Sequence, residues 1–121
     1  PSDGYWMAPK VFGKADPKSE IAQQETFGPV LLVQTYTDRA EGIRLANSTI
    51  YGLSAGVFGA DQDEATRVAR KIRCGTVHVN GLNTNPLAPF GGMGQSGYGR
   101  EYGEHGLREF LEIKSIQPPA A

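Results

Sequence analysis

The sequence predicts an α/β fold in which parallel strands are joined by crossover helices, and three observations support this prediction. Three short runs, residues 30–36, 53–58 and 76–80, have the length and the apolar composition of buried strands. The two segments between these runs each begin with an aspartate followed three residues later by a glutamate, which is typical of a helix N-terminus. Because strands and helices alternate at this spacing, we expect two crossover units and one parallel sheet covered on both faces.

Before the first of these strands, the chain contains only short elements. Residues 5–7 and 11–12 are extended segments on either side of Pro9, which favours a position at a sheet edge because proline has no amide hydrogen to donate. Residues 15–19 form a polar connection, and residues 21–24 are expected to make one helical turn.

The two crossover helices are predicted from their caps and their apolar spacing. The first is expected to run from Asp38 to about Asn47, and the second from Asp61 towards Gly75. The second helix carries one apolar stripe, formed by Ala65, Val68, Ala69 and Ile72.

The last third of the chain has a different character. Residues 83–89 form a loop, and the next eleven residues, 90–100, contain five glycines. A helix is expected over residues 100–110, followed by a terminal strand at 111–116, where apolar and polar residues alternate.

Composition limits the classes of binding partner and the cellular compartment that we expect for this chain. With 121 residues the chain is at most one domain, expected to bury about two-thirds of its unfolded surface. The net charge of −1 gives no support for nucleic-acid or membrane binding, and the single cysteine suits the reducing cytoplasm. Since the sequence starts at Pro1 and runs directly into strand-like residues, we expect it to be a piece of a longer protein.

One pair of side chains, Glu25 and Phe27, is a candidate binding site. Side chains two residues apart on an extended segment point to the same side, so this pair would present a carboxylate and a flat apolar ring together. Such a pair suits a ribose and its base. An exposed glutamate beside a core phenylalanine is the plainer alternative.

Other motifs give no complete catalytic set. Residues 92–97 match G-x-G-x-x-G, but the strand that a dinucleotide-binding loop requires does not directly precede them. Cys74 follows a predicted helix C-terminus, where the dipole disfavours a thiolate, and is interpreted as a structural thiol. His78 and His105 lack further ligands at a recognisable spacing, so no metal site is expected.

Taken in order, the motifs resemble the C-terminal part of the aldehyde dehydrogenase superfamily. The segments that carry the resemblance are 24–30, 45–49, 51–58, 74–80, 89–92, 95–101, 103–107 and 112–116. The resemblance implies that Glu25 hydrogen-bonds the hydroxyls of the nicotinamide ribose and that Phe27 packs near the nicotinamide. It also implies that Phe90 lines the aldehyde entrance, that residues 81–88 shape substrate preference, and that residues 111–117 form an intersubunit strand of a homo-oligomer.

The resemblance further implies a reaction, and it implies that the residues for this reaction are distributed over a chain longer than 121 residues. The family oxidises an aldehyde to a carboxylic acid with NAD or NADP, using a cysteine nucleophile and a glutamate base. Both residues and the cofactor-binding domain would lie upstream, so residues 1–121 would be a partial catalytic domain, inactive alone. Two alternatives stay open: a free-standing, non-catalytic interaction module with the same fold, and a domain of a bifunctional enzyme.

Overall fold

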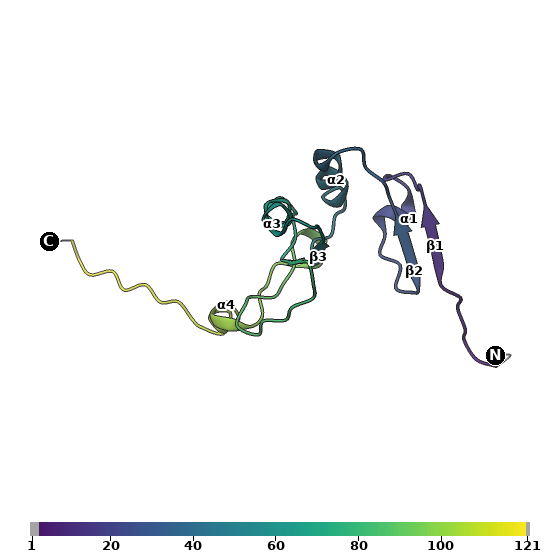
Figure 1. The fold of residues 1–121 in the computed structure, drawn as a ribbon. Coiled ribbons are helices and arrows are strands. Elements are labelled where there is room, and N and C mark those ends of the chain that lie inside the picture. Colours follow the sequence, from purple (N-terminus) through teal and green to yellow (C-terminus); the bar gives the residue numbers. More distant parts are fainter. Residues whose placement is uncertain (1–2, 121) are drawn as a thin grey trace.

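The computed structural model describes residues 3–120, whose strands and helices alternate along most of the chain (Figure 1). In chain order, the elements are β1 (Lys10–Gly13), α1 (Glu20–Gln23), β2 (Val30–Val33), α2 (Arg39–Ala46), β3 (Ser54–Val57), α3 (Gln62–Ala69), β4 (Thr76–Val79), the 3-10 turn η1 (Gly94–Ser96) and α4 (Gly103–Arg108). None of the helices in this described range is long and apolar enough to cross a membrane.

The four strands pair in parallel, which confirms the predicted α/β class. β1 pairs with β2, with Lys10 opposite Val30, and β3 pairs with β4, with Ser54 opposite Thr76. However, within the described residues the strands form two separate two-stranded sheets rather than one. The helix α2 carries the chain from β2 to β3, yet these strands do not pair, and Figure 1 shows β3 below α2 and the β1–β2 sheet apart from it on the right. The apolar runs predicted the strands, but they do not specify which strands are neighbours.

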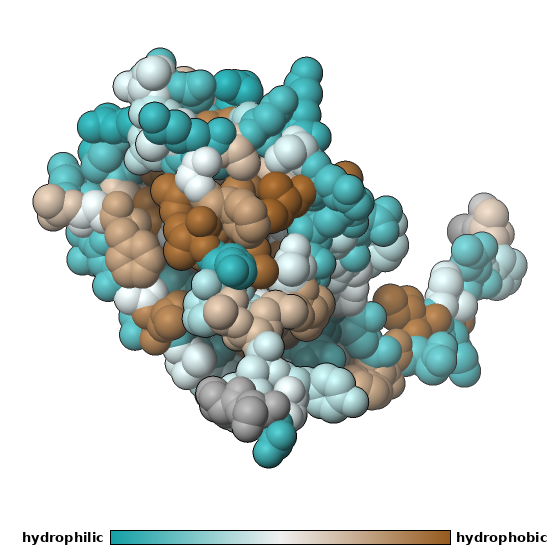
Figure 2. Space-filling view, turned by 90° about the vertical axis from the view of Figure 1, so that its right-hand side faces the viewer, coloured by the Kyte–Doolittle hydropathy of each residue, from teal (hydrophilic) through white to brown (hydrophobic). Residues whose placement is uncertain are grey.

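The expectation that residues 30–36 are covered on both faces is wrong for this chain. β2 ends at Val33, and its burial alternates: Val30 and Leu32 are half-buried, whereas the side chain of Leu31 is 58% exposed. Alternation of this kind is typical of a sheet with one covered face. Figure 2, which looks at the molecule from the β1–β2 side, shows hydrophobic side chains gathered in the middle of this face.

Both predicted aspartate caps form, although both crossover helices are short. The carboxylate of Asp38 accepts a hydrogen bond from the amide of Glu41 at 2.8 Å, and that of Asp61 accepts one from the amide of Glu64 at 3.0 Å. These bonds satisfy amides that have no partner within the helix. α3 ends at Ala69, earlier than predicted, so Ile72 lies in the turn that follows the helix.

The chain is much less buried than its length predicts. A compact protein of 13.0 kDa exposes about 6,300 Å² of surface and the extended chain about 19,000 Å². The observed surface is 10,232 Å², so less than half of the extended-chain surface is buried, and the expected two-thirds is wrong. Among the described apolar side chains, those of Ala65 and Cys74 are the only ones classed as buried.

The C-terminal end also differs from the sequence prediction. α4 starts only at Gly103, because Tyr102 and Gly103 both have positive φ angles, of 64° and 58°. Residues 111–120 form no strand within the chain and extend away from the rest of it (Figure 1), with Ile113 96% exposed. The intersubunit role of residues 111–117 requires a second chain and stays a prediction.

Candidate functional site

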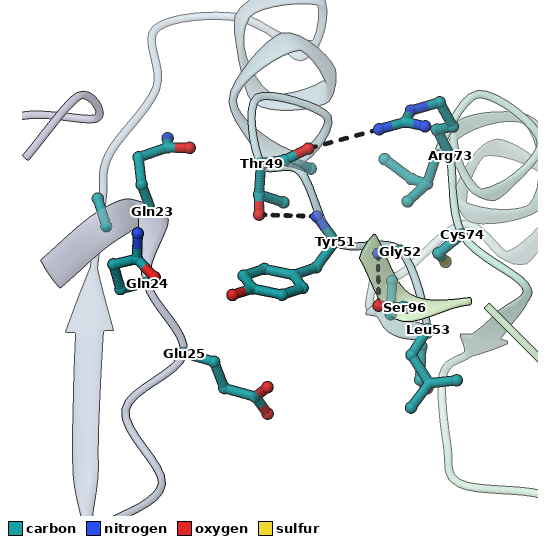
Figure 3. Close-up of a pocket in the computed structure, with 15 residues that line it drawn as sticks. Gln23, Gln24, Glu25, Thr49, Tyr51, Gly52, Leu53, Arg73, Cys74 and Ser96 are labelled. Atoms are coloured by element: carbon teal, nitrogen blue, oxygen red, sulfur yellow. Dashed lines mark hydrogen bonds between the residues drawn. The ribbon is translucent and has the colours of Figure 1, made fainter. Parts of the chain in front are cut away.

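Glu25 lies at an open cavity of about 500 Å³ between the two halves of the chain. One wall is the end of α1 and the residues that follow it, and the other is the connection from α2 to β3 together with residues 72–74. Figure 3 shows the side chains of Gln24, Glu25 and Tyr51 directed into the space between these walls. Glu25 is exposed, and within residues 3–120 its carboxylate has no hydrogen-bond or ion-pair partner, so both oxygens are able to accept from a ligand.

Phe27 is not brought into the same cavity as Glu25. Its side chain is 95% exposed and does not line the cavity at Glu25. The two residues predicted to act as a pair are therefore neighbours on one loop, but only Glu25 lines this open cavity.

The cavity wall opposite Glu25 is built on an asparagine clamp at the end of α2. The side chain of Asn47 donates to the carbonyl of Lys71 at 2.8 Å and accepts from the amide of Arg73 at 2.7 Å. The guanidinium of Arg73 in turn donates to the carbonyl of Thr49 at 3.4 Å (Figure 3). This clamp ties the connection after α2 to the turn after α3, and the cavity wall is made from both segments.

Gly52 joins this wall to the glycine-rich segment. Its carbonyl accepts hydrogen bonds from the amides of Gly75 and Met93, both at 3.0 Å, and its amide donates to the Ser96 hydroxyl at 3.1 Å (Figure 3). A Cβ atom on Gly52 would lie 2.7 Å from the carbonyl oxygen of Arg73, and one on Gly75 would overlap the carbonyl of Gly91. The glycines thus allow backbone segments to pack directly on one another.

The G-x-G-x-x-G match at residues 92–97 has a different setting from a dinucleotide-binding loop. The preceding strand, β4, ends at Val79, and the motif contains the 3-10 turn η1 instead of the start of a helix. The structure therefore supports the interpretation that this match is not a phosphate-binding loop.

Phe90 lies at a second cavity, of about 430 Å³. This cavity is lined by Thr76 and His78 of β4, by most of the loop at residues 83–89, and by Tyr102. The rings of Phe90 and Tyr102 are 6.1 Å apart between centroids and tilted by 42°. The structure thus places Phe90 and the loop that was expected to shape substrate preference around one space.

A further cavity, of about 630 Å³, connects these two regions. It is lined by Leu53 and Ser96, which also line the cavity at Glu25, and by Phe90 and Tyr102, which line the second one. The glycine-rich segment at residues 90–100 therefore contributes to all three spaces.

Cys74 has the environment of a structural thiol. It is buried, its sulfhydryl donates to the carbonyl of Thr76 at 3.0 Å, and desolvation raises the pKa of the thiol. A raised pKa leaves less thiolate at neutral pH, which disfavours a nucleophilic role. Among residues 3–120, no three histidine, cysteine, aspartate or glutamate side chains gather as a metal site would require.

Four polar residues that line or brace these cavities were not predicted from the sequence, namely Asn47, Tyr51, Ser96 and Arg100. Asn47 carried one usable signal, because it follows the last apolar turn of a helix and asparagine favours helix ends. Ser96 and Arg100 carried no such signal, because they bond the backbone of residues outside any local motif: Ser96 accepts from the Gly52 amide, and Arg100 donates to the Gly92 carbonyl.

The chain matches one known protein family over most of its length. A sequence model of the aldehyde dehydrogenase family matches residues 1–116. Putative aldehyde dehydrogenases of Staphylococcus saprophyticus and Staphylococcus aureus are each 50% identical to this chain over 113 residues. The match covers 93% of this chain and 24% of each relative, so the chain spans about a quarter of the length of these curated relatives.

Solved structures show the same similarity in three dimensions. A mutant of aldehyde dehydrogenase C from Pseudomonas syringae, in complex with NAD+ and octanal, is 47% identical with a TM-score of 0.83. The match covers 92% of this chain and 24% of that one. An aldehyde dehydrogenase of Mycobacterium tuberculosis in complex with NAD+ is 39% identical with a TM-score of 0.84, covering 90% and 23% of the two chains.

Proposed function

Because this chain belongs to the aldehyde dehydrogenase family, we propose that it works as the C-terminal quarter of an NAD(P)-dependent enzyme that oxidises an aldehyde to a carboxylic acid. The observation that carries the proposal is the carboxylate of Glu25, which has no partner among residues 3–120 and lies at the cavity between the two halves of the chain. The bound NAD+ in structures 47% and 39% identical to this chain supports a nicotinamide cofactor.

Glu25 is the cofactor-positioning residue in this proposal. A carboxylate without a protein partner offers two acceptor oxygens, which fit the two adjacent hydroxyls of a ribose. When bound, the nicotinamide supplies the hydride acceptor, and the protein contributes its orientation. Phe27, whose ring is 95% exposed on the same loop, would pack near the nicotinamide and limit where it sits.

Phe90 and the loop at residues 81–88 form the aldehyde entrance in this proposal. Phe90 and much of this loop surround a cavity whose lining includes the aromatic ring of Tyr102 and the imidazole of His78. Such a space suits an apolar aldehyde tail with a few polar contacts. The identity of the loop residues would then set which aldehydes are accepted.

The 121-residue chain alone is expected to be inactive. The reaction needs a thiolate nucleophile and a general base, and the buried Cys74, with its raised pKa, does not fit the first role. These groups and most of the cofactor contacts would come from the remaining three quarters of a polypeptide of the relatives' length. NADH formation from octanal should be undetectable with the 121-residue chain and measurable with the longer polypeptide. Turnover by the short chain would contradict the proposal.

Replacement of Glu25 tests the cofactor role directly. In the complete enzyme, Glu25→Gln should slow single-turnover NADH formation about tenfold, because misplaced reactants lose the benefit of orientation. The KM for the aldehyde should change less than the rate of hydride transfer. Glu20→Gln is the matched control, since Glu20 is an exposed carboxylate in α1. Unchanged single-turnover kinetics in Glu25→Gln would refute the assignment.

The assembly of the enzyme is proposed from the C-terminal segment. Residues 111–117 are exposed and extended, and we propose that they pair with a sheet of a second subunit to form a homo-oligomer. The single, buried cysteine is compatible with a cytoplasmic enzyme.

A non-catalytic interaction module is the second candidate function. The observation that favours it is the same exposed segment, which offers unpaired backbone groups to any partner strand. The intact mass of the natural product separates the two. A mature chain of about 13 kDa, the mass of these 121 residues, would favour the module, and one about four times longer would favour the enzyme.

A further inference from the structure

The guanidinium of Arg100 links the two ends of the glycine-rich segment at residues 90–100 by hydrogen bonds. The Nη1 atom of Arg100 donates to the carbonyls of Gly92 at 2.8 Å, Tyr98 at 3.1 Å and Gly99 at 2.8 Å. The bonds to Tyr98 and Gly99 are local, whereas the bond to Gly92 spans the loop. Gly92 is buried, so without Arg100 its carbonyl would lose a partner in a place that water reaches poorly.

The segment that Arg100 closes has Phe90 at its base. Phe90 and Glu101 exchange two backbone hydrogen bonds as an isolated antiparallel bridge, with N···O distances of 2.8 and 2.7 Å. Between this bridge and the bond at Gly92, the backbone of Gly91 packs against the carbonyl of Gly99. A Cβ atom on Gly91 would also lie 3.0 Å from the Cδ atom of Arg100, so the arginine side chain lies directly against this backbone.

Side-chain packing does little to fix this segment. Five of its eleven residues are glycines, and the ring of Tyr98 is 90% exposed. Glycine has the largest backbone freedom of any residue, so hydrogen bonds must supply the order. All three bonds come from Nη1, a single atom of the planar guanidinium, and this atom lies one bond further from the backbone than a lysine ammonium would.

We propose that Arg100 is a positioning residue for the aldehyde entrance. By fixing the loop that the Phe90–Glu101 bridge closes, it sets where the Phe90 ring lies relative to Tyr102 and to the cavity that the two rings share. This inference rests on the proposed function, because it takes Phe90 as part of the aldehyde entrance. Arg100 itself does not line that cavity and acts through Phe90.

Steady-state kinetics of the complete enzyme test the proposal. Arg100→Met should raise the KM for octanal about fivefold or more while the KM for NAD+ stays within about twofold, because only the entrance loses its geometry. Arg100→Lys keeps the charge but places its donor one bond nearer the backbone, so its KM for octanal should lie between those of the wild type and Arg100→Met. Arg108→Met is the matched control, since it removes an exposed guanidinium that pairs with Glu104 on α4. Full rescue by lysine, or an equal effect on both substrates, would overturn the proposal.

Hydrogen exchange in the same polypeptide gives a readout that does not depend on activity. Arg100→Met should speed exchange at the amides of Phe90 and Glu101 about tenfold, while the amides of α3 keep their protection. If the wild-type enzyme oxidises neither octanal nor any other aldehyde of a panel from acetaldehyde to benzaldehyde but these amides still respond, the proposed function is wrong and the positioning of Phe90 by Arg100 stands. If Arg100→Met does not fold, Arg100→Lys decides the question with the same two measurements. Unchanged exchange and unchanged KM together would refute the inference.

Discussion

The two halves of this chain, β1–α1–β2 and β3–α3–β4, are built from the same parallel strand–helix–strand unit. Among the described residues, only the second half buries apolar side chains. In the first half, β1 and β2 expose apolar side chains, including Val11 at 69% and Leu31 at 58%. The helix between them, α1, has four residues, and Ser19 makes no side-chain cap for it. In the second half, α3 packs on both β3 and β4, and Ala65 and Cys74 are buried.

What distinguishes the second half is contact between backbone segments rather than a larger set of apolar residues. The side chain of Asn47, the backbone of Gly52 and the guanidinium of Arg100 each make a hydrogen bond to a group at least eight residues away in the sequence. The first half has fewer such ties, with the weak bond from the Gln34 side chain to the Ala15 carbonyl at 3.5 Å as an example. The packing of the β3–α3–β4 unit therefore depends on hydrogen bonds made by its loops as much as on the contacts of α3.

The largest expected effect comes from breaking the close backbone contact at Gly75. Gly75→Ala places a methyl group on the carbonyl of Gly91, and since neither backbone segment can yield cheaply, we expect a loss of about 3 kcal/mol or more in the free energy of unfolding. Urea unfolding with local hydrogen exchange measures the change and assigns it to the second half. Gly13→Ala in β1 is the matched control, because a Cβ atom there meets open space. Equal effects of the two substitutions would remove the distinction between the halves.

An intermediate effect is expected from the exposed face of the first half. The isolated 121-residue chain should self-associate, because Leu31 and Val33 lie on one uncovered face of a two-stranded sheet. Leu31→Lys should shift the sedimentation profile towards monomer. Leu82→Lys controls for added charge, since Leu82 is 82% exposed but lies in a loop away from this sheet. A compact wild-type monomer with sharp unfolding would contradict the prediction.

Local sequence signals predicted the elements well and their assembly poorly. Asp38 and Asp61 marked two helix starts correctly, because a cap depends only on residues three positions apart. The single sheet was wrong because pairing between β2 and β3 depends on strand order, which apolar runs do not encode. The burial of Leu31 was overestimated for a similar reason. A run of apolar residues predicts that both faces of a strand are buried, but it does not show which segment would pack on each face.

The candidate site was predicted only where a residue acts through its own side chain. Glu25 was found from a short motif and Phe90 from the resemblance to the aldehyde dehydrogenase superfamily, and the structure places each at a cavity. The predicted partnership of Glu25 with Phe27 was not reproduced within that cavity, because two-residue alternation says nothing about where the opposite wall lies. Arg100 was missed because its partners are three carbonyls, and backbone acceptors leave no pattern in a sequence.

The smallest expected effect, a response to acid, should again separate the halves. The amide and the hydroxyl of Thr37, and then Arg44, lower the pKa of Glu41, and the amide of Glu64 is the main cause of the lowered pKa of Asp61. Because these pKa values are lower in the folded than in the unfolded chain, the folded state binds fewer protons. Their stabilising contribution is therefore complete at neutral pH and is lost as the pH falls below about 4. An NMR titration should show inflections in the amide shifts of Thr37 and Glu64 and weaker changes in β1 and β2. Glu41→Gln should abolish the inflection at Thr37. Glu20→Gln in α1, which has no side-chain cap, is the control and should leave the inflection in place. An inflection that survives Glu41→Gln would show that another group titrates there.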